Sequence, residues 1–248
     1  FTWNYHNFPS APSGQLKSYM DAKGLKLTGI VKPRLFTGTQ EAADMDANGW
    51  WYSRTGVIED YCAKKPVKQV DFSKEGLRKW WWQQSQKAFD LGLVGFWNDE
   101  VDLDNGFQNF DGLNMQRAIY DGQTAYTSEQ RVWSINRNYY TGAQRYGYGL
   151  WSGDIRTGFD SMKYHKDKLI GSINLGEAKW GMDTGGFIGT PDSENYTRWI
   201  QFSAFTPIFR VHGQDINEGN KVRYPWAYGE KAEAAAKSVM QLRYKLIP

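Results

Sequence analysis

The sequence is poor in the residues on which several classes of protein depend. It contains a single cysteine, Cys62, which excludes an internal disulfide and a cysteine-rich metal site. Its three histidines, His6, His165 and His212, are too scattered to form a zinc-ligand pair of the H-E-x-x-H type. No apolar run is long enough to cross a bilayer. The glycine-rich loops G-x-G-x-x-G and G-x-x-x-x-G-K-[ST] are also missing, so phosphate binding is not supported.

A strong excess of either charge is missing as well. The 30 basic and 27 acidic residues are interspersed and give a formal net charge of +3. This balance gives no electrostatic reason to expect a nucleic acid or an anionic membrane as a partner. We therefore predict no nucleic-acid partner, no membrane partner, no metal and no cofactor.

What the chain does contain is an unusual number of aromatic side chains. They make up 16% of its 248 residues, with 12 tryptophans and 15 tyrosines. Packing of the core accounts for part of this number. Because sugar rings present flat C–H faces, tryptophan and tyrosine also serve as stacking platforms in carbohydrate sites. The composition is thus a hint of carbohydrate binding.

Short apolar runs alternate with amphipathic stretches, a pattern typical of βα units and a parallel sheet. The expected strands are Leu25–Val31, Leu93–Trp97, Arg131–Ile135, Gly149–Trp151, Lys179–Met182 and Ile208–Val211. The expected helices are Gly14–Lys23, Asp71–Leu91 with Ser73 as its N-cap, Asn114–Thr127, Asp160–Asn174, Glu194–Phe205 and Glu230–Leu246. No repeat, low-complexity tract or linker divides the chain, so we expect one domain over residues 1–248.

Polar or charged residues end most of these expected strands. They are Asp99, Arg137, Asp154, Asp183 and His212. In a (β/α)8 barrel the active site lies at the C-terminal ends of the strands. A doubly wound sheet would instead gather such residues at one switch point. The sequence therefore predicts an α/β fold of the (β/α)8 TIM-barrel type.

Two segments combine an aromatic strand with a carboxylate. The first is Gly95-Phe-Trp-Asn-Asp-Glu-Val-Asp102, and the second is Arg145-Tyr-Gly-Tyr-Gly-Leu-Trp-Ser-Gly-Asp154. Glycoside cleavage needs an anion on one face of the sugar and a proton donor at the leaving oxygen. Simpler alternatives stay open from the pattern alone. Acids after a strand also cap helices, solvate loops or bind Mg²⁺ or Ca²⁺, and the second segment is compatible with a plain turn.

These segments resemble motifs of glycoside hydrolase family 31. The first is similar to its nucleophile motif, W-x-D-M-N-E, and the second to its acid/base motif, an arginine followed by W-x-G-D. Gly181-Met-Asp-Thr-Gly-Gly-Phe187 resembles the family's G-x-D-x-G-G-F segment. Residues 198–212 resemble its R-W-x-Q-x-x-A-F-x-P-x-x-R-x-H stretch. The motifs occur in the family's order and cover the chain essentially from end to end.

The resemblance implies a retaining α-glycoside hydrolase that acts on α-linked glucosides or related sugars through a covalent glycosyl-enzyme. Asp99 would be the nucleophile. Asp154 would protonate the leaving oxygen and then activate water or an acceptor hydroxyl. These roles require Asp99 to be ionised and Asp154 to be protonated at rest. In a retaining site the two carboxyls are expected about 5–5.5 Å apart.

The resemblance also implies substrate-binding roles for further residues. Trp97, Trp151 and Phe187 would form apolar walls, and Arg137, Asp183 and His212 would contact sugar hydroxyls. For the three aromatic residues, core packing is the competing interpretation. For the histidine it is a hydrogen-bonded loop residue, and for the aspartate it is a structural hydrogen bond.

The chain also departs from the family pattern beside the predicted nucleophile. Glu100 replaces the usual methionine, and Val101 and Asp102 replace the usual asparagine and glutamate. Lys32 stands in Ile30-Val-Lys-Pro-Arg34, where the family commonly has the acid of a D-P pair. If the side chain of Lys32 enters the pocket, it changes which hydroxyls are recognised. The family alternatives are therefore an α-galactosidase, an α-N-acetylgalactosaminidase and an α-transglucosylase.

Two alternatives from other classes also stay open. One is a non-catalytic carbohydrate-binding fragment, and the other is a metal-dependent hydrolase with Asp99, Glu100 and Asp102 as ligands. The resemblance covers what would be the third to the eighth strand of the barrel, so that the first two would be lacking. We therefore expect this chain to be a segment of a longer multidomain polypeptide, with a β-sandwich and the first strands upstream.

Overall fold

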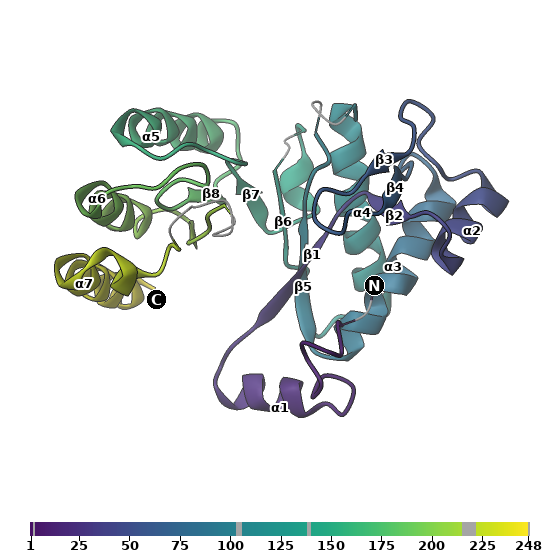
Figure 1. Cartoon of the computed structure of the whole chain (residues 1–248), viewed down its shortest axis with the longest axis horizontal. Coiled ribbons are helices and arrows are strands. Elements are labelled where there is room, and N and C mark those ends of the chain that lie inside the picture. The colour runs from purple at the N-terminus through teal and green to yellow at the C-terminus, as the bar shows by residue number, and fades with distance from the viewer. Residues whose placement is uncertain (2, 103–105, 138–139, 215–221, 248) are drawn as a thin grey trace. The chain divides into compact units, whose positions relative to one another are not determined.

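The computed structural model describes residues 1, 3–102, 106–137, 140–214 and 222–247. The chain divides into two compact units, unit 1 over Phe1–Tyr148 and unit 2 over Gly149–Pro248. Each unit contains three parallel strands joined through helices (Figure 1). In the part of the chain that is described, no helix is long and apolar enough to span a membrane.

The predicted site residues of unit 1 lie on its three parallel strands or directly after them. In the order β1-β5-β6 they are β1 (Leu27–Val31), β5 (Leu93–Asn98) and β6 (Ser134–Asn136). Trp97 is level with Ile30 of β1 and with Ile135 of β6. Side chains alternate between the two faces of a strand, so Trp97 and Asp99 share the face of β5 opposite to Phe96.

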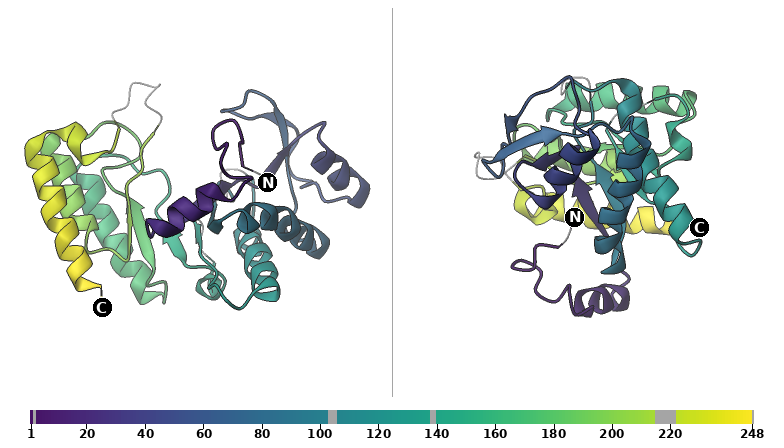
Figure 2. Two further views of the ribbon diagram at one scale, coloured as in Figure 1. Left: turned by 90° about the horizontal axis from the view of Figure 1, so that it is seen from below. Right: turned by 90° about the vertical axis from the view of Figure 1, so that its right-hand side faces the viewer.

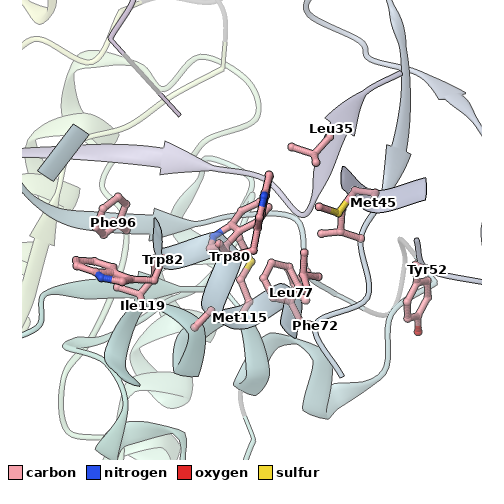
Figure 3. Close-up of a cluster of buried hydrophobic side chains, with 14 of the residues drawn as sticks. Leu35, Met45, Tyr52, Phe72, Leu77, Trp80, Trp82, Phe96, Met115 and Ile119 are labelled. Atoms are coloured by element: carbon pink, nitrogen blue, oxygen red, sulfur yellow. The ribbon is translucent and has the colours of Figure 1, made fainter. Parts of the chain in front are cut away.

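Helices cover the Phe96 face of β5. They are α3 (Glu75–Asp90) and α4 (Asn109–Tyr126), and both contact β5. Trp82 of α3 lies beside Phe96, with ring centroids 6.4 Å apart, and Ile119 of α4 is fully buried nearby (Figure 3). A Cβ atom at Gly122 would lie 2.1 Å from the Trp82 side chain, so only glycine lets α4 approach α3 this closely.

Between β1 and α3 the chain makes an excursion that the sequence did not predict. It contains β2 (Arg34–Phe36), α2 (Gln40–Asn48), β3 (Ile58–Glu59) and β4 (Pro66–Gln69). The three strands form an antiparallel sheet in the order β2-β4-β3. These strands depend on pairing with one another rather than on a local pattern in the sequence. The helix α1 (Gln15–Ala22) precedes β1.

Two predicted helix starts are wrong. The helix α3 begins at Glu75, and Lys74 rather than Ser73 occupies the N-cap position. The backbone N–H of Ser73 instead donates to Asp71 Oδ1 at 2.9 Å, which forms a local turn ahead of the helix. The helix α4 begins at Asn109 instead of Asn114, because Gln108 and the N3 residue Asp111 form a capping box.

The strands of unit 2 are β7 (Gly149–Trp151), β8 (Trp180–Asp183) and β9 (Ile208–Arg210), in the order β7-β8-β9. Its helices α5 (Phe159–Asn174), α6 (Ser193–Ser203) and α7 (Glu230–Leu246) lie side by side (Figures 1 and 2). Tyr196 of α6 stacks on Tyr228 with ring centroids 3.8 Å apart. Short 3-10 turns occur at Ala143–Arg145 in unit 1 and at Pro225–Tyr228 in unit 2.

Candidate active site

Asp99 follows the last residue of β5 and lies in a charged environment within unit 1. It is 7% exposed, and its backbone N–H donates to the carbonyl of Val31 at 3.0 Å. Arg137, which directly follows β6, donates from Nη1 to Asp99 Oδ1 at 3.3 Å. The same guanidinium lies 2.8 Å from Asp102 Oδ2 through its Nε. Arg137 therefore connects two carboxylates of the first motif to the end of β6.

Opposing influences act on the ionisation of Asp99. Burial raises the pKa of the Asp99 carboxyl above its ordinary value, and the negative charge of Glu100 acts in the same direction. Arg137 and Lys32 favour the charged form and offset part of this rise. A nucleophilic carboxylate has to be ionised when the sugar arrives. Arg137 and Lys32 are the two cations that favour this state.

Glu100 connects the end of β5 to two cations from the segment around β1 and β2. Lys32 Nζ lies 2.5 Å from Glu100 Oε1, and Arg34 forms a second ion pair through Glu100 Oε2. Burial opposes ionisation of Glu100, but the hydrogen bonds from Arg34 and Lys32 hold the pKa of its carboxyl below the ordinary value. Lys32 and Glu100, two of the departures from the family pattern, are thus partners of one another.

The backbone of Glu100 adopts a left-handed conformation with φ of 61°. A non-glycine residue rarely takes this conformation, and holding it costs on the order of 1 kcal/mol or more. The side chain is clamped between two cations, which keeps the residue in place. This strained position comes directly after Asp99.

Cations surround the three carboxylates that were considered as metal ligands. Arg137 lies against Asp99 and Asp102, while Glu100 is paired with a lysine and a second arginine. These three carboxylates are thus paired with cations of the chain itself. Within the described residues no group of three histidine, cysteine, aspartate or glutamate side chains has the geometry of a metal site.

Unit 2 contains a second group of predicted residues, arranged around a buried ion pair. Asp183, the last residue of β8, has no exposed surface, and Arg210 Nε of β9 lies 2.8 Å from its Oδ1. The guanidinium of Arg210 also lies 4.8 Å from the ring centroid of Trp151 in β7. Trp151 is 2% exposed. The arginine therefore links the carboxyl ends of all three strands of this unit.

His212 stacks on Phe187 near this ion pair. The two ring centroids are 5.1 Å apart, at an interplanar angle of 26°. Burial lowers the pKa of His212 to about 4, and the positive charges of Arg210 and Arg223 act in the same direction. The imidazole is consequently neutral at pH 7. A neutral imidazole offers one hydrogen-bond donor and one acceptor, which suits a sugar hydroxyl.

Backbone contacts fix the loop that carries Phe187. Arg223 donates from Nε to the carbonyl of Gly186 at 3.0 Å and from Nη2 to that of Phe187 at 3.4 Å. Gly186 has φ of 82°, and a Cβ atom there would lie 2.4 Å from the backbone nitrogen of Thr157. Only glycine fits this turn. The position of the Phe187 ring is thus determined by the backbone of unit 2.

Asp154 is exposed and follows β7 closely in the chain. Ser152 continues the strand by donating its backbone N–H to the carbonyl of Gly181 at 3.0 Å, and Gly153 then turns the chain with φ of 75°. A general acid/base has to be reached by the water molecule that it activates. The exposed carboxyl of Asp154 is compatible with this role.

The predicted residues fall into two groups, one in each unit. Unit 1 brings together Asp99, Arg137 and Lys32, with Trp97 on the same face of β5 as Asp99. Unit 2 contains Trp151, Asp154, Asp183, Phe187 and His212. The roles assigned to these residues stay predictions. So does the expectation that the carboxyls of Asp99 and Asp154 face one another.

Sequence reasoning missed several neighbours of these groups. Arg210 lies inside a recognised motif, and its spacing from His212 was a signal that it belongs to the site. Arg34, Asp60 and Tyr61 lie in or beside the excursion between β1 and α3, and no sequence motif marks them. Their connection to Glu100 exists only in the folded chain.

Comparisons with known proteins identify the family and the fold of the chain. A family model described as the glycosyl hydrolases family 31 TIM-barrel domain matches residues 1–248. A 1,6-alpha-glucosyltransferase of Sporosarcina globispora is 42% identical over 100% of this chain and 21% of its own length. Alpha-glucosidase 2 of Bacillus thermoamyloliquefaciens is 30% identical over 100% of this chain and 34% of its own length.

Solved structures have the same fold. A dextranase of this family from Flavobacterium johnsoniae, complexed with glucose, matches with a TM-score of 0.77 and 26% identity, over 94% of this chain and 32% of that one. An alpha-xylosidase of the family from a soil metagenome, complexed with xylose, has a TM-score of 0.83 at 24% identity. It is matched over 94% of this chain and 40% of its own. The chain thus spans between about a fifth and two fifths of these relatives.

Proposed function

Because the chain belongs to glycosyl hydrolase family 31 as a TIM-barrel domain, we propose that it carries the catalytic residues of a retaining α-glycoside hydrolase acting on α-linked glucosides. Membership confirms the family and the fold class expected from the sequence. The observation that carries the proposal is Asp99, a buried carboxylate at the carboxyl end of β5 that an arginine from the next strand holds in place. The observation fits the role of a fixed anion beside a reacting sugar.

In the first step of the proposed reaction, a carboxylate oxygen of Asp99 attacks the anomeric carbon. The glycosidic C–O bond breaks, and Asp154 gives its proton to the departing oxygen. The product is a β-linked glycosyl ester of Asp99. Arg137 stabilises the anionic carboxylate before the attack, and its bond to Asp102 keeps the guanidinium in place.

In the second step, Asp154 takes a proton from an incoming hydroxyl group, whose oxygen then attacks the anomeric carbon. The ester bond to Asp99 breaks, and the carboxylate is regenerated with the α-configuration restored in the product. Water as acceptor gives hydrolysis, and a sugar hydroxyl gives transfer. In this proposal the neutral imidazole of His212 contacts a hydroxyl of the sugar.

Glucosyl transfer is the second candidate function. It is favoured by the 42% identity to a relative named as a 1,6-alpha-glucosyltransferase. Both reactions use the same covalent intermediate, so the same two aspartates serve either outcome. Product analysis at high substrate concentration separates them, because longer oligosaccharides accumulate only when a sugar hydroxyl competes with water for the intermediate.

The test of the proposal is the Asp99→Ala variant with azide. We expect turnover of an aryl α-glucoside to fall by several orders of magnitude, and azide to restore it by attacking the anomeric carbon, with release of a β-glucosyl azide. The matched control is Asp102→Ala, which removes the other carboxylate bound to Arg137. Azide should not rescue this control, because its nucleophile is intact.

Two outcomes would overturn the proposal. One is an α-configured azide product, or none, from the Asp99→Ala variant. The other is measurable sugar binding by the wild-type protein without turnover of any aryl α-glycoside in a panel of gluco, galacto, xylo and N-acetylgalactosamino substrates. The second result would favour a non-catalytic carbohydrate-binding protein. Turnover of one sugar in the panel identifies the donor specificity.

A further inference from the structure

Glu100, the residue directly after Asp99, stands at a change of backbone conformation. The backbone N–H of Asp99 donates to the carbonyl of Val31 at 3.0 Å and so continues the pairing of β5 with β1. Glu100 has φ of 61°, in the left-handed region that non-glycine residues rarely adopt. The extended backbone therefore stops at Glu100, and the conformation of this residue sets how Asp99 ends the strand.

Two cations hold the side chain of Glu100. Lys32 Nζ lies 2.5 Å from its Oε1, and Arg34 Nη1 donates to its Oε2. The side chains of these cations are 21% and 7% exposed, respectively. Charge-assisted hydrogen bonds from two sides fix the direction of a carboxylate. A return of Glu100 to an ordinary backbone conformation would turn its side chain away from both cations.

The excursion between β1 and α3 anchors Arg34. From β2, this arginine donates through Nε and Nη2 to Asp60 Oδ2 at 3.0 Å and 2.8 Å. Asp60 Oδ1 accepts in turn from the backbone N–H groups of Cys62 at 3.0 Å and Ala63 at 2.8 Å, which fixes the turn after β3. A buried guanidinium with a carboxylate on each side is a rigid connection. The antiparallel sheet β2-β4-β3 therefore supports Glu100.

Tyr61, in the same turn, anchors Lys32. The Lys32 ammonium lies 4.1 Å from the centroid of the Tyr61 ring and donates to its hydroxyl. The Arg34 guanidinium lies 5.6 Å from the same centroid. An aromatic ring beside two cations favours their charged forms. We call these five residues, Lys32, Arg34, Asp60, Tyr61 and Glu100, the support cluster; its two cations balance its two carboxylates.

The support cluster also acts on the charge of Asp99. Burial has the largest effect and raises the pKa of the Asp99 carboxyl, and the negative charge of Glu100 raises it further. Arg137, after β6, and Lys32, after β1, lower this pKa, and Arg137 is shared with Asp102. The Lys32 ammonium thus compensates the anion that disfavours an ionised Asp99.

We propose that Glu100 is a positioning residue for Asp99 and that the rest of the support cluster holds it in this role. This inference rests on the proposed function, in which Asp99 is the nucleophile. The left-handed turn at Glu100 fixes the direction of the Asp99 carboxyl, and Lys32 balances the charge beside it. A misplacement of about 1 Å costs a reacting group about a hundredfold in rate. Glu100 exerts both effects without contacting the sugar.

The first test separates the backbone of Glu100 from its side chain. Glu100→Gly and Glu100→Ala both remove the carboxylate, but only glycine adopts the left-handed region without a penalty. The readout is the single-turnover rate of aryl release from an aryl α-glucoside at saturation. We expect this rate to fall about tenfold in Glu100→Gly and about fivefold further in Glu100→Ala. The substrate concentration at half-saturation should stay within about twofold of the wild type, because the sugar contacts are intact.

The matched control is Lys64, an exposed residue with a positive φ of 52° in the turn after β3 and outside the support cluster. Lys64→Gly and Lys64→Ala repeat the backbone comparison, and their rates should equal one another. Assays well below the unfolding temperature of each variant keep losses of stability out of the comparison. Equal rates in Glu100→Gly and Glu100→Ala, or a loss confined to the half-saturation concentration, would overturn the positioning role.

The second test uses the acid limb of kcat/KM against pH, which reports the ionisation of the nucleophile. Lys32→Met removes a cation, so the pKa of Asp99 should rise and the limb should move to higher pH. Glu100→Gln removes an anion and should move the limb to lower pH. We expect about 0.5–1 pH unit in each direction, and a limb close to that of the wild type when the two changes are combined.

Two further variants refine the pH test. Lys32→Arg keeps the charge and should restore the position of the limb. Tyr61→Ala loosens the ammonium and should move the limb in the same direction as Lys32→Met, but less far. A merely structural role predicts no movement, or movement in the same direction for Lys32→Met and Glu100→Gln. Either result would overturn the inference.

A titration without substrate separates this inference from the proposed function. The carboxyl ¹³C signal of Asp99, identified by its loss in Asp99→Asn, reports the pKa of this group by NMR and needs no turnover. If the wild-type protein cleaves no substrate, but this pKa rises in Lys32→Met and falls in Glu100→Gln, the proposed reaction fails and the action of the support cluster on Asp99 stands. If the pKa moves in the same direction in both variants, or in neither, the inference is wrong.

Discussion

The charged side chains near the predicted site residues are arranged differently in the two units. Around Asp99 in unit 1, cations and carboxylates form a network that reaches the surface, with side-chain exposures of 7–21% at its ion pairs. In unit 2 the carboxylate of the ion pair between Asp183 and Arg210 is fully buried, because Asp183 has no exposed surface. Beside this pair lie three of the residues predicted to bind the sugar, namely Trp151, Phe187 and His212, whose imidazole is neutral.

This difference matches the parts that the units have in the proposed reaction. A nucleophile has to stay charged in a partly dry site, so it needs cations close by. Groups that hold sugar hydroxyls and ring faces work without net charge, and the proton carrier Asp154 is exposed to water. Unit 1 should therefore tolerate single charge losses better, because Arg137, Arg34 and Glu100 each have two partners of opposite charge, whereas the carboxylate of Asp183 in unit 2 is fully buried.

The largest expected effect is on stability, from Asp183→Ala. This change leaves the guanidinium of Arg210 without its buried carboxylate, and breaking such a pair costs about 3–5 kcal/mol. In unit 1, Asp102→Ala should cost about 1 kcal/mol or less, because Arg137 keeps its bond to Asp99 and is itself 21% exposed. Urea denaturation of both variants measures the difference.

A double variant tests whether the loss comes from the unpaired charge. Asp183→Leu combined with Arg210→Met replaces both ions by apolar groups and should recover most of the stability. Equal costs for Asp183→Ala and Asp102→Ala would contradict the distinction between the units.

The pH dependence of stability should be dominated by unit 2 above pH 4.5. His212 has a folded pKa of about 4, against an ordinary value of 6.5. Between these values the unfolded chain binds a proton that the folded chain does not, so stability falls as the pH falls from 6.5 towards 4. The expected loss is about 2–3 kcal/mol.

His212→Gln should flatten this part of the profile, and His6→Gln, at an exposed histidine, serves as the control. Glu100 in unit 1 affects the stability of the fold at lower pH. Its pKa is held below the ordinary 4.5, so its ion pairs stabilise the fold above that value and are lost as the pH falls through the folded pKa. An unchanged slope between pH 6.5 and 4.5 in His212→Gln would refute the assignment to this histidine.

Much of the fold could be predicted from the sequence because the parallel strands are short apolar runs with polar ends. The expected strand Gly149–Trp151 has the bounds of β7, and Leu93–Trp97 is β5 without its last residue. The excursion between β1 and α3 escaped prediction because β2, β3 and β4 depend on pairing with one another rather than on local pattern. The prediction that Ser73 caps the helix is wrong for a local reason. The backbone N–H of Ser73 donates to the side chain of Asp71, which forms a turn ahead of the helix.

The candidate site was predictable only where a motif marks it. The motifs identified Asp99 and Asp183, and also showed that Lys32 and Glu100 are unusual. They did not reveal that these last two residues pair, because the partners are 68 positions apart and the contact exists only when β1 lies beside β5. No sequence pattern marks Tyr61, because its position depends on the turn after β3.

A third prediction measures the coupling between Lys32 and Glu100. In a double-mutant cycle of Lys32→Met and Glu100→Gln, the interaction free energy should be about 1–2 kcal/mol, because the side chains are only 21% and 14% exposed. The matched control is Lys17 with Asp21 in α1, a pair at the same distance of 2.5 Å with 51% and 45% exposure.

The control pair should couple clearly more weakly, because water screens it. Denaturation at low and high salt distinguishes the two, since only the exposed pair should weaken strongly with salt. Equal coupling in both pairs would show that burial of the Lys32 pair adds nothing.

The smallest effects are expected at helix caps, where the units offer a matched comparison that is independent of the site. Thr39 caps α2 in unit 1 by accepting from the N–H of Ala42 at 3.2 Å, and Asp192 caps α6 in unit 2 by accepting from Asn195 at 2.7 Å. An alanine at either position should cost about 0.5–2 kcal/mol. The cost at Asp192 should be the larger, because a charged cap also interacts with the helix dipole and makes the shorter bond. Denaturation of Asp192→Asn checks the cause, because this variant keeps a capping side chain of similar shape and removes the charge. Loss of the advantage over Thr39 in this variant would assign the difference to charge, and an advantage that persists would assign it to packing.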